Sequence, residues 1–306
     1  MTQPWLAPDA RPPESPAAQG VAHAAVAHNT GAGEIGAVPS PVPLRPMTVA
    51  DILDGGIAVI KAAPRSIFVI AGCFVVPLEL VTAWVQRESL AESGLTSALS
   101  DALSSESSDT GFTWASILLL VASGLVLSLV TGAVAHLLSS WYADRAPTAG
   151  DAIRVSLRRA PALFGAWFLV HVVEGAALLA LLIPLLFVMP LFLVTAPAIV
   201  IERLGPWQGV RRSWRLTRVR YGAVLGAGIL IAIVSTVLTV ALSGLGLAFS
   251  FFSFGWIFDV ICRAASSLVT EPFVAAATTL VYFDLRIRTE GLDLELDIAE
   301  HFNRVG

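Results

Sequence analysis

Charge is the scarcest feature of this 306-residue sequence. Charged residues make up 14% of it and hydrophobic residues 56%, whereas soluble globular domains carry roughly 25% charged and about 45–50% apolar residues. A soluble fold with so little charge could not cover its surface, and no repeat or polar bias supports a collagen, coiled-coil or disordered chain. The composition therefore predicts an all-α integral membrane protein that crosses the bilayer several times.

The sequence also lacks the residue patterns of known catalytic and metal centres. Its two cysteines, Cys73 and Cys262, lie in apolar runs, where we interpret them as small buried hydrophobic residues. It contains no Walker loop and no G-x-S-x-G, H-E-x-x-H or C-x-x-C motif. We therefore expect no catalytic residues, no cofactor and no enzyme activity.

Long apolar runs predict six membrane-spanning helices. A helix needs roughly 20 residues to cross a hydrocarbon layer of about 30 Å. Residues 161–201 are long enough for two crossings, and Pro184 and Pro190 indicate a tight hairpin between them. The predicted spans are residues 66–85, 114–140, 162–183, 187–201, 222–248 and 256–283.

Proline and charge organise the rest of the chain. Residues 1–47 hold nine of the eighteen prolines and few bulky residues, so we expect a disordered tail there. The membrane domain is expected at 48–283 and a C-terminal tail at 284–306. Of the nineteen lysines and arginines, all but Arg87 and Arg263 fall on one side of the six-span topology. The positive-inside rule then places both termini on the cytoplasmic side of the plasma membrane.

Two cytoplasmic segments share a pattern at an offset of one hundred residues. Thr48 precedes Asp51 by three residues, and Thr148 precedes Asp151 in the same way, which is a capping arrangement for a helix start. Each segment continues with a helical apolar face and ends in an Ala-Pro pair before a span. A looser third copy begins at Pro206. These copies indicate three short interfacial helices and a threefold repeat of one such helix followed by a helical hairpin.

The third interfacial segment is rich in arginine and predicts contacts with lipid headgroups. Two tryptophans, Trp207 and Trp214, accompany the arginines. The segment either binds anionic headgroups or is an ordinary positive-inside loop anchored by its tryptophans. We expect membrane lipids as partners, together with a membrane or cytoplasmic protein partner, and no nucleic acid. The candidate headgroup contacts are Arg211, Arg212, Arg215, Arg218 and Arg220.

Ionisable residues inside the predicted spans mark a candidate intramembrane polar site, because such residues are rare there. Their estimated depths match, which predicts one polar layer in the outer half of the bundle with Arg263 as the cation that offsets the acids. Glu271 precedes Pro272, so it occupies either a substrate or proton position beside a kink or a structural position as a protonated acid. No metal is expected, since the spacing does not require the ligands to converge. The candidate residues are Glu79, His171, Glu174, Asp259, Arg263 and Glu271.

Small residues predict close helix packing at two places. Gly124, Ser128 and Gly132 line one face of the second predicted span. Gly222 and Gly226 do so on the fifth. Such stripes let helix backbones approach one another within a membrane.

Three phrases carry a family resemblance: PLRPMTVADILDGG at 43–56, RLGPWQGVRRSWRLTRVRYGAVLG at 203–226 and LVYFDLRIRTEGLDLEL at 280–296. They resemble a family of actinobacterial polytopic membrane proteins often labelled the glycerophosphoryl diester phosphodiesterase membrane domain. The resemblance implies the membrane fold from about residue 43 to 297. It does not imply phosphodiesterase activity, because the segments outside the apolar runs are too short for a catalytic barrel.

Two functions remain open from the sequence. The first is a non-enzymatic membrane scaffold or complex subunit that acts at the inner face of the membrane. The alternative is a transporter or lipid-handling protein that uses the polar site around Glu271 and Arg263.

Overall fold

The described part of the chain is all helical and contains no strand. The computed structural model describes residues 42, 45–85, 114–143, 148–179, 187–248 and 255–291. The helices in these residues are α2 (Val49–Ala62), α3 (Pro64–Val85), α6 (Trp114–Trp141), α7 (Ala149–Leu179), the 3-10 helix η2 (Met189–Phe192), α9 (Thr195–Ile201), α10 (Pro206–Val219), α11 (Tyr221–Ala248) and α12 (Gly255–Glu290).

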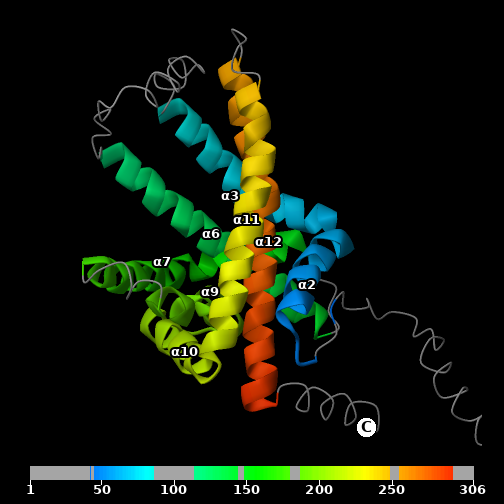
Figure 1. Cartoon of the computed structure of the whole chain (residues 1–306), viewed down its shortest axis with the longest axis vertical. Helices are drawn as coiled ribbons and strands as arrows, with labels where there is room; N and C mark the ends of the chain where they lie inside the picture. The colour runs from blue at the N-terminus through cyan, green and yellow to red at the C-terminus, as the bar shows by residue number, and fades with distance from the viewer. Residues whose placement is uncertain are drawn as a thin grey trace, which may run out of the picture. The chain divides into compact units, whose positions relative to one another are not determined.

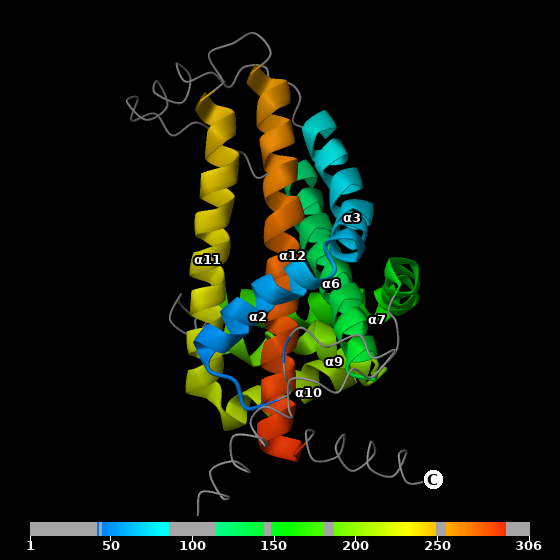
Figure 2. The same ribbon diagram turned by 90° about the vertical axis from the view of Figure 1, so that its right-hand side faces the viewer.

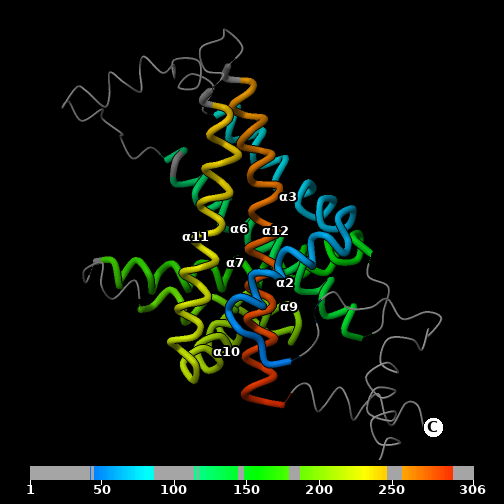
Figure 3. The backbone as a smooth tube through the Cα atoms, turned by 45° about the vertical axis from the view of Figure 1, so that its right-hand side comes forward, coloured from blue at the N-terminus to red at the C-terminus, as the bar shows by residue number. Residues whose placement is uncertain are grey.

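Five of the described helices are long and apolar enough to cross a membrane, as expected of a multi-pass membrane protein. They contain the segments Pro64–Val85, Ile117–Trp141, Ala149–Leu178, Tyr221–Gly246 and Ile257–Glu290. Helices α11 and α12 lie side by side, and α3 and α6 also pack against α12. Helix α7 lies across the direction of α11 and α12 (Figures 1 and 3).

The fourth predicted span, residues 187–201, is not one helix of membrane length. It consists of two helical residues at 187–188, the four-residue η2, a two-residue turn and the seven-residue α9. Pro190 and Pro197 lie in this stretch, and proline lacks the amide proton that a continuous helix needs. The Thr195 hydroxyl donates to the carbonyl of Phe192 at 2.7 Å across the turn. The count of six spans is therefore not confirmed, and the predicted hairpin around residue 184 lies outside the described residues.

The predicted helix starts are confirmed at both capping threonines. The Asp51 amide donates to Thr48 Oγ1 at 3.2 Å, and the Thr48 amide donates to Asp51 Oδ2 at 2.8 Å. The bond from the Thr48 amide, more than any other contact, holds the pKa of Asp51 below its ordinary value. The Asp151 amide likewise donates to Thr148 Oγ1 at 3.1 Å. Beyond these caps the two segments differ, since α7 runs through Pro161 whereas α2 stops before Pro64.

The packed part of the chain extends beyond both predicted boundaries of the membrane domain. Val42 is buried ahead of the expected boundary at residue 47, and its carbonyl accepts a hydrogen bond from the Tyr142 hydroxyl at 3.0 Å. Helix α12 continues past residue 283 as far as Glu290. The predictions for residues 1–41 and 292–306 fall outside the described residues.

The start of α2 and the end of α12 are tied together. The Met47 amide donates to Asp284 Oδ1 at 2.7 Å, and Arg288 Nη2 donates to the Met47 carbonyl at 2.9 Å. Asp284 itself is buried and also accepts from Arg288 Nε at 2.8 Å. These bonds hold the two ends of the described chain, which are far apart in the sequence, directly against each other.

The second half of α12 forms the centre of the core. Ala275, Ala276, Ala277, Leu280 and Tyr282 are fully buried there. Helix α2 crosses this part of α12 (Figure 2). The two helices are close at this crossing: a Cβ atom added to Gly56 would lie only 3.3 Å from the Phe273 ring. The small residues of α12 thus let the short helix α2 pack closely on it, and the end of α12 lies against α10 and α11.

Candidate functional site

One of the five candidate headgroup arginines, Arg212, is half-buried and bound to two glutamates of other segments. Arg212 Nε donates to Glu202 Oε1 at 2.8 Å, and its Nη2 donates to Glu290 Oε2 at 2.8 Å. Burial alone would lower the pKa of Arg212, but these bonds to Glu290 and Glu202 raise it above its ordinary range. Tyr282 also donates to Glu202 at 2.7 Å. Arg212 therefore joins the turn after α9 to the end of α12.

Arg220 is the second arginine of the set that faces the protein. Its Nη1 lies 3.7 Å from Asp284 Oδ2, close enough for an ion pair but beyond hydrogen-bond distance. Asp284 is the same carboxylate that accepts from Met47 and Arg288. Arg220 therefore adds positive charge to the junction of α2, α11 and α12, and the sequence pattern did not separate it from its neighbours.

The remaining three arginines form an outward surface on α10. Arg211, Arg215 and Arg218 are exposed, and none forms an ion pair with an acid in the described part of the chain. They repeat at helical spacing, so they share one face. Trp207 and Trp214 lie on the same side and are 66% and 42% exposed. We call Trp207, Arg211, Trp214, Arg215 and Arg218 the α10 outer face.

The opposite side of α10 is buried, and its two hydroxyl groups are both hydrogen-bonded. Ser213 Oγ donates to the Leu191 carbonyl at 2.8 Å, and Thr217 Oγ1 lies 3.1 Å from the same oxygen. A side chain on Gly209 would meet Ile199 at 2.2 Å, so α10 and α9 pack closely at that point. These contacts fix the face of α10 that packs against the η2–α9 segment, and Figure 3 shows the two segments side by side.

Among the intramembrane residues, Asp259 and Arg263 form a pair as their spacing predicts. Arg263 Nε donates to Asp259 Oδ2 at 2.8 Å along one face of α12. The backbone of α11 comes close here, since a side chain on Gly246 would meet the Asp259 Cα at 2.9 Å. No ion pair joins Arg263 to Glu79, Glu174 or Glu271 in the described structure. Arg263 is therefore paired with Asp259. The predicted compensation of the three glutamate charges by Arg263 is not seen among the described residues.

Two glutamates meet between α3 and α12. Ser267 Oγ donates to Glu79 Oε1 at 2.7 Å, and Glu271 lies one turn further along α12, within electrostatic reach of Glu79. The Oε2 atom of Glu271 is buried and has no hydrogen-bond partner among the described residues. Asp259, Arg263, Ser267 and Glu271 repeat every fourth residue, so this polar stripe follows one side of α12.

His171 and Glu174 form a third group on α7. His171 Nε2 lies 3.9 Å from Glu174 Oε2, and its Nδ1 lies 2.9 Å from the Trp167 carbonyl. The prediction of a single polar layer assumed that all the spans run parallel. Helix α7 instead lies across α11 and α12 (Figure 1), and the predicted residues form three separate groups: Asp259 with Arg263, Glu79 with Glu271, and His171 with Glu174. The described residues contain no cluster of three or more His, Cys, Asp or Glu side chains that could hold a metal ion.

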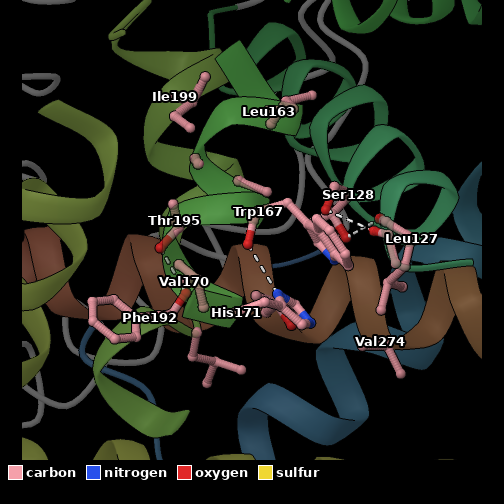
Figure 4. Close-up of a pocket in the computed structure, with 16 residues that line it drawn as sticks. Leu127, Ser128, Leu163, Trp167, Val170, His171, Phe192, Thr195, Ile199 and Val274 are labelled. Atoms are coloured by element: carbon pink, nitrogen blue, oxygen red, sulfur yellow. Dashed lines mark hydrogen bonds between the residues drawn. The ribbon is translucent and has the colours of Figure 1, made fainter. Parts of the chain in front are cut away.

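A half-open pocket of about 270 Å³ lies between α6, α7, the η2–α9 segment and α12 (Figure 4). Its walls are mainly apolar, with Leu163, Val170 and Ile199 among them. The Trp167 indole lies at the pocket, and its Nε1 atom is buried without a hydrogen-bond partner among the described residues. Of the predicted intramembrane residues only His171 lines this pocket, and its other polar groups belong to tryptophan, serine and threonine. Reasoning from clustered ionisable residues therefore did not predict it.

The absence of a side chain at Gly124 leaves the space that the Trp167 ring occupies. A side chain on Gly124 would meet Trp167 Nε1 at 2.2 Å, and one on Gly132 would meet Val200 at 2.9 Å. The predicted close helix packing on this face of α6 is therefore confirmed at Gly132, whereas at Gly124 the space holds the Trp167 ring and Ser128 lines the pocket. The corresponding prediction for α11 is wrong, since no atom lies within 4 Å of a side chain built on Gly222 or Gly226. That face of α11 points away from the described helices.

A family model described as a domain of unknown function (DUF7847) matches residues 169–285. The match covers the end of α7, the α10 outer face, α11 and most of α12, and it leaves out α2, α3 and α6. Comparison with curated proteins and with solved structures finds no match.

Proposed function

We propose that this chain is a non-enzymatic component of the plasma membrane that gathers anionic lipid at the inner face and acts there as a scaffold or complex subunit. The observation that carries the proposal is the division of arginines on α10. Arg212 is half-buried and bound to two glutamates of other segments, while Arg211, Arg215 and Arg218 are exposed beside two exposed tryptophans. The inner arginine anchors the helix that presents the outer ones.

The chemistry of the α10 outer face fits an anionic lipid surface. An arginine near anionic headgroups contributes about 1 kcal/mol of attraction, so three together favour anionic over neutral lipid strongly at low salt. Tryptophan prefers the level of the headgroups, where its ring is apolar and its N–H is wet. A helix with this face lies in the plane of the interface.

The proposed orientation places both termini in the cytoplasm. It is supported by the excess of arginine near the contacting ends of α2 and α12, where Arg220, Arg286 and Arg288 lie. The positive-inside rule assigns such an end to the cytoplasmic side.

Lipid enrichment around the full-length chain tests the proposal. The chain is reconstituted in nanodiscs of phosphatidylglycerol and phosphatidylcholine, and spin-labelled lipids report which headgroup is motionally restricted at the protein. The variant R211Q/R215Q/R218Q should lower the preference for phosphatidylglycerol about tenfold or more. A matched control, K61Q/R154Q/R158Q, removes three exposed cations from α2 and α7 and should change it far less. Equal losses in both variants would refute a specific role for α10.

The scaffold part of the proposal has its own measurement. Mass spectrometry of the chain gently extracted from its native membrane would record proteins that remain bound in fixed stoichiometry. A stoichiometric partner is expected for a subunit or scaffold. Retained lipid with no protein partner would limit the function to lipid binding.

The polar stripe of α12 supports a second candidate function, lipid handling or transport. Glu271 has a buried carboxyl oxygen without a described partner, next to Glu79, and buried ionisable groups in membranes often mark a translocation path. Proteoliposomes with fluorescently labelled phosphatidylglycerol would report transbilayer movement by loss of signal to an external quencher. Glu271→Gln should abolish movement above that of protein-free vesicles. If the wild-type chain shows none, this candidate fails.

A further inference from the structure

We infer that a second pocket, between α2, α11 and α12, holds the phosphate of one anionic phospholipid, with Arg220 and Arg288 as its cationic partners and the first part of its acyl chains against an apolar wall. The pocket is half open and has a volume of about 300 Å³, which lies at the lower limit for small-ligand sites. It is separate from the α10 outer face, so the inference goes beyond the proposed function.

The lining of this pocket changes from charged to apolar along its two long helices. Arg220 directly precedes α11, and Val224 and Ala227 follow it on the pocket side of that helix. Helix α12 runs beside α11 in the opposite direction (Figure 2), and there Val281 comes before Arg288. The charged ends of the two helices therefore meet, and their apolar ends meet about 10 Å further along. Such a pocket fits a ligand that is charged at one end and apolar at the other.

The charged end of the pocket has one more cation than acid. Arg220 Nη1 lies 3.7 Å from Asp284 Oδ2, and Arg288 Nε donates to Asp284 Oδ1 at 2.8 Å. One carboxylate thus faces two guanidinium groups, and the described lining contains no other charged residue. Two of the three helices also begin at the pocket, α2 at Val49 and α11 at Tyr221, and the start of a helix favours an anion. The remaining positive charge matches a single anionic group such as a phosphodiester.

The acid in the first turn of α2 does not cancel this positive charge. Asp51 lies outside the pocket lining and accepts from the Thr48 amide at 2.8 Å. It also forms an ion pair with Arg45 at 3.3 Å. Arg45 therefore balances Asp51, and the two pocket arginines remain in excess over Asp284.

Both guanidinium groups have donors that a ligand can reach. The side chains of Arg220 and Arg288 are 35% and 29% exposed. Arg220 lies too far from Asp284 for a hydrogen bond, and it donates to no other described residue. Arg288 uses Nε and Nη2 on Asp284 and Met47, which leaves its Nη1 donors for a ligand. The planar fork of arginine donates strongly to phosphate oxygens.

The position of the pocket along α11 favours a membrane lipid over a soluble phosphate. Arg220 is the last charged residue before Tyr221–Gly246, a segment long and apolar enough to cross a membrane and without a charged residue. A residue directly ahead of such a segment lies at the level of the lipid headgroups. The phosphate of a lipid lies at that same level, and its acyl chains extend in the direction of Val224 and Ala227. A phospholipid therefore matches both ends of the pocket, whereas a free phosphate would leave the apolar wall uncovered.

Native mass spectrometry of the full-length chain tests the site. The chain in detergent micelles is titrated with phosphatidylglycerol, and the masses report how many lipids stay bound and with what dissociation constant. The wild-type chain should retain one phosphatidylglycerol more tightly than any further lipid. Glycerophosphoglycerol has the same headgroup without acyl chains, and it should bind about tenfold more weakly or worse because it covers no apolar surface. Inorganic phosphate should bind as weakly, for the same reason.

Two kinds of variant separate the phosphate contact from the apolar wall. Arg220→Gln removes a charged donor, so the affinity for the retained lipid should fall about tenfold or more. Arg220→Lys keeps the charge without the fork and should give an intermediate affinity, while Arg154→Gln, at an exposed position of α7, should keep that of the wild type. Ala223→Phe fills the mouth of the pocket from an exposed position and should remove the tightly bound lipid. Its matched control is Ile233→Phe, which makes a similar change on an exposed part of α11 outside the pocket. Circular dichroism checks that each variant is folded.

Several outcomes would overturn the inference. Equal affinities of the wild-type chain and folded Arg220→Gln would exclude the phosphate contact, and a tight lipid that persists in Ala223→Phe would lie elsewhere. Inorganic phosphate that binds as tightly as phosphatidylglycerol would show that the ligand is a soluble phosphate, and oleate that displaces the lipid at equal concentration would show that it is a carboxylate. The variant R211Q/R215Q/R218Q should still retain the single lipid, so failure of the α10 proposal and failure of this one are distinguishable.

Discussion

Residues 48–64 and 148–161 follow the same sequence pattern and adopt different structures. Each begins with a threonine cap and an aspartate three residues later, and each ends in an Ala-Pro pair. In the first, Ala63 leaves the helical conformation and α3 begins at Pro64. In the second, the helix continues through Pro161 to Leu179. The same local signals thus produce a break in one place and a single 31-residue helix in the other.

Tertiary contacts explain this difference. Helix α2 is held across α12 through the Met47–Asp284 bond and the close approach at Gly56, so the chain must turn before it can run along α12 as α3. The first half of α7 packs on α6 through Ser156 Oγ, which donates to the Leu129 carbonyl at 2.7 Å. Nothing in that contact requires a turn, and α7 therefore continues across the other helices.

The largest effect is expected from Asp284→Ala, which removes the anchor of α2. Asp284 is buried and accepts from Met47 and Arg288. Its loss removes the acceptor of the buried Met47 amide and leaves two partly exposed arginines without their partner, so the expected cost is about 2–3 kcal/mol. The free energy of unfolding in mixed micelles, followed by circular dichroism, should fall by that amount. Asp259→Ala, whose partner Arg263 is more exposed, is the control and should cost clearly less.

Replacing the two prolines tests whether α7 carries strain that the α2–α3 junction avoids. Pro161 lies inside a helix, where proline is about 3 kcal/mol less favourable than alanine, so Pro161→Ala should stabilise the chain by up to about 3 kcal/mol. Pro64 occupies the first position of α3, where proline is tolerated, and Pro64→Ala should change stability by less than about 1 kcal/mol. Equal effects on the unfolding midpoint would contradict this account of the two segments.

Ser156→Ala should loosen the first half of α7 by a smaller amount. The hydroxyl is buried and links α7 to α6, and a neutral hydrogen bond contributes about 1 kcal/mol. Ser235→Ala removes a bond within α11 that is exposed, so it should have almost no effect. Amide hydrogen exchange localised to residues 149–160 would show whether the loss is confined to that segment.

The smallest effects are expected where the two segments are alike. Thr48→Ala and Thr148→Ala each remove a helix cap, worth about 1 kcal/mol, and should accelerate amide exchange in the first turn of α2 and of α7 to a similar extent. A much larger response at Thr148 would mean that its cap also holds the position of α7. Serine at either position keeps the capping oxygen and should restore the wild-type rate.

The candidate site was predictable from sequence only in part. The arginines of α10, its start at Pro206 and the Asp259–Arg263 pair follow from helical spacing, which relates residues within a few turns. The separation of Arg212 from Arg211 and Arg215 did not follow, because it depends on Glu202 and Glu290 in other segments. Trp167 carried no signal of its own, since a tryptophan in an apolar run is ordinary until its N–H is seen to lack an acceptor.

The sequence by itself determined the membrane class, the capped helix starts and the apolar lengths of most spans, because these depend on composition and on contacts between residues a few positions apart. The tertiary structure decided which proline breaks a helix, which arginines face outward and where a pocket is left between α6, α7 and α12. Those outcomes depend on bonds such as Met47 with Asp284, 237 residues apart. Local sequence patterns cannot specify such pairings, because the hydrogen bonds within each helix form equally well whichever distant segment the helix packs against.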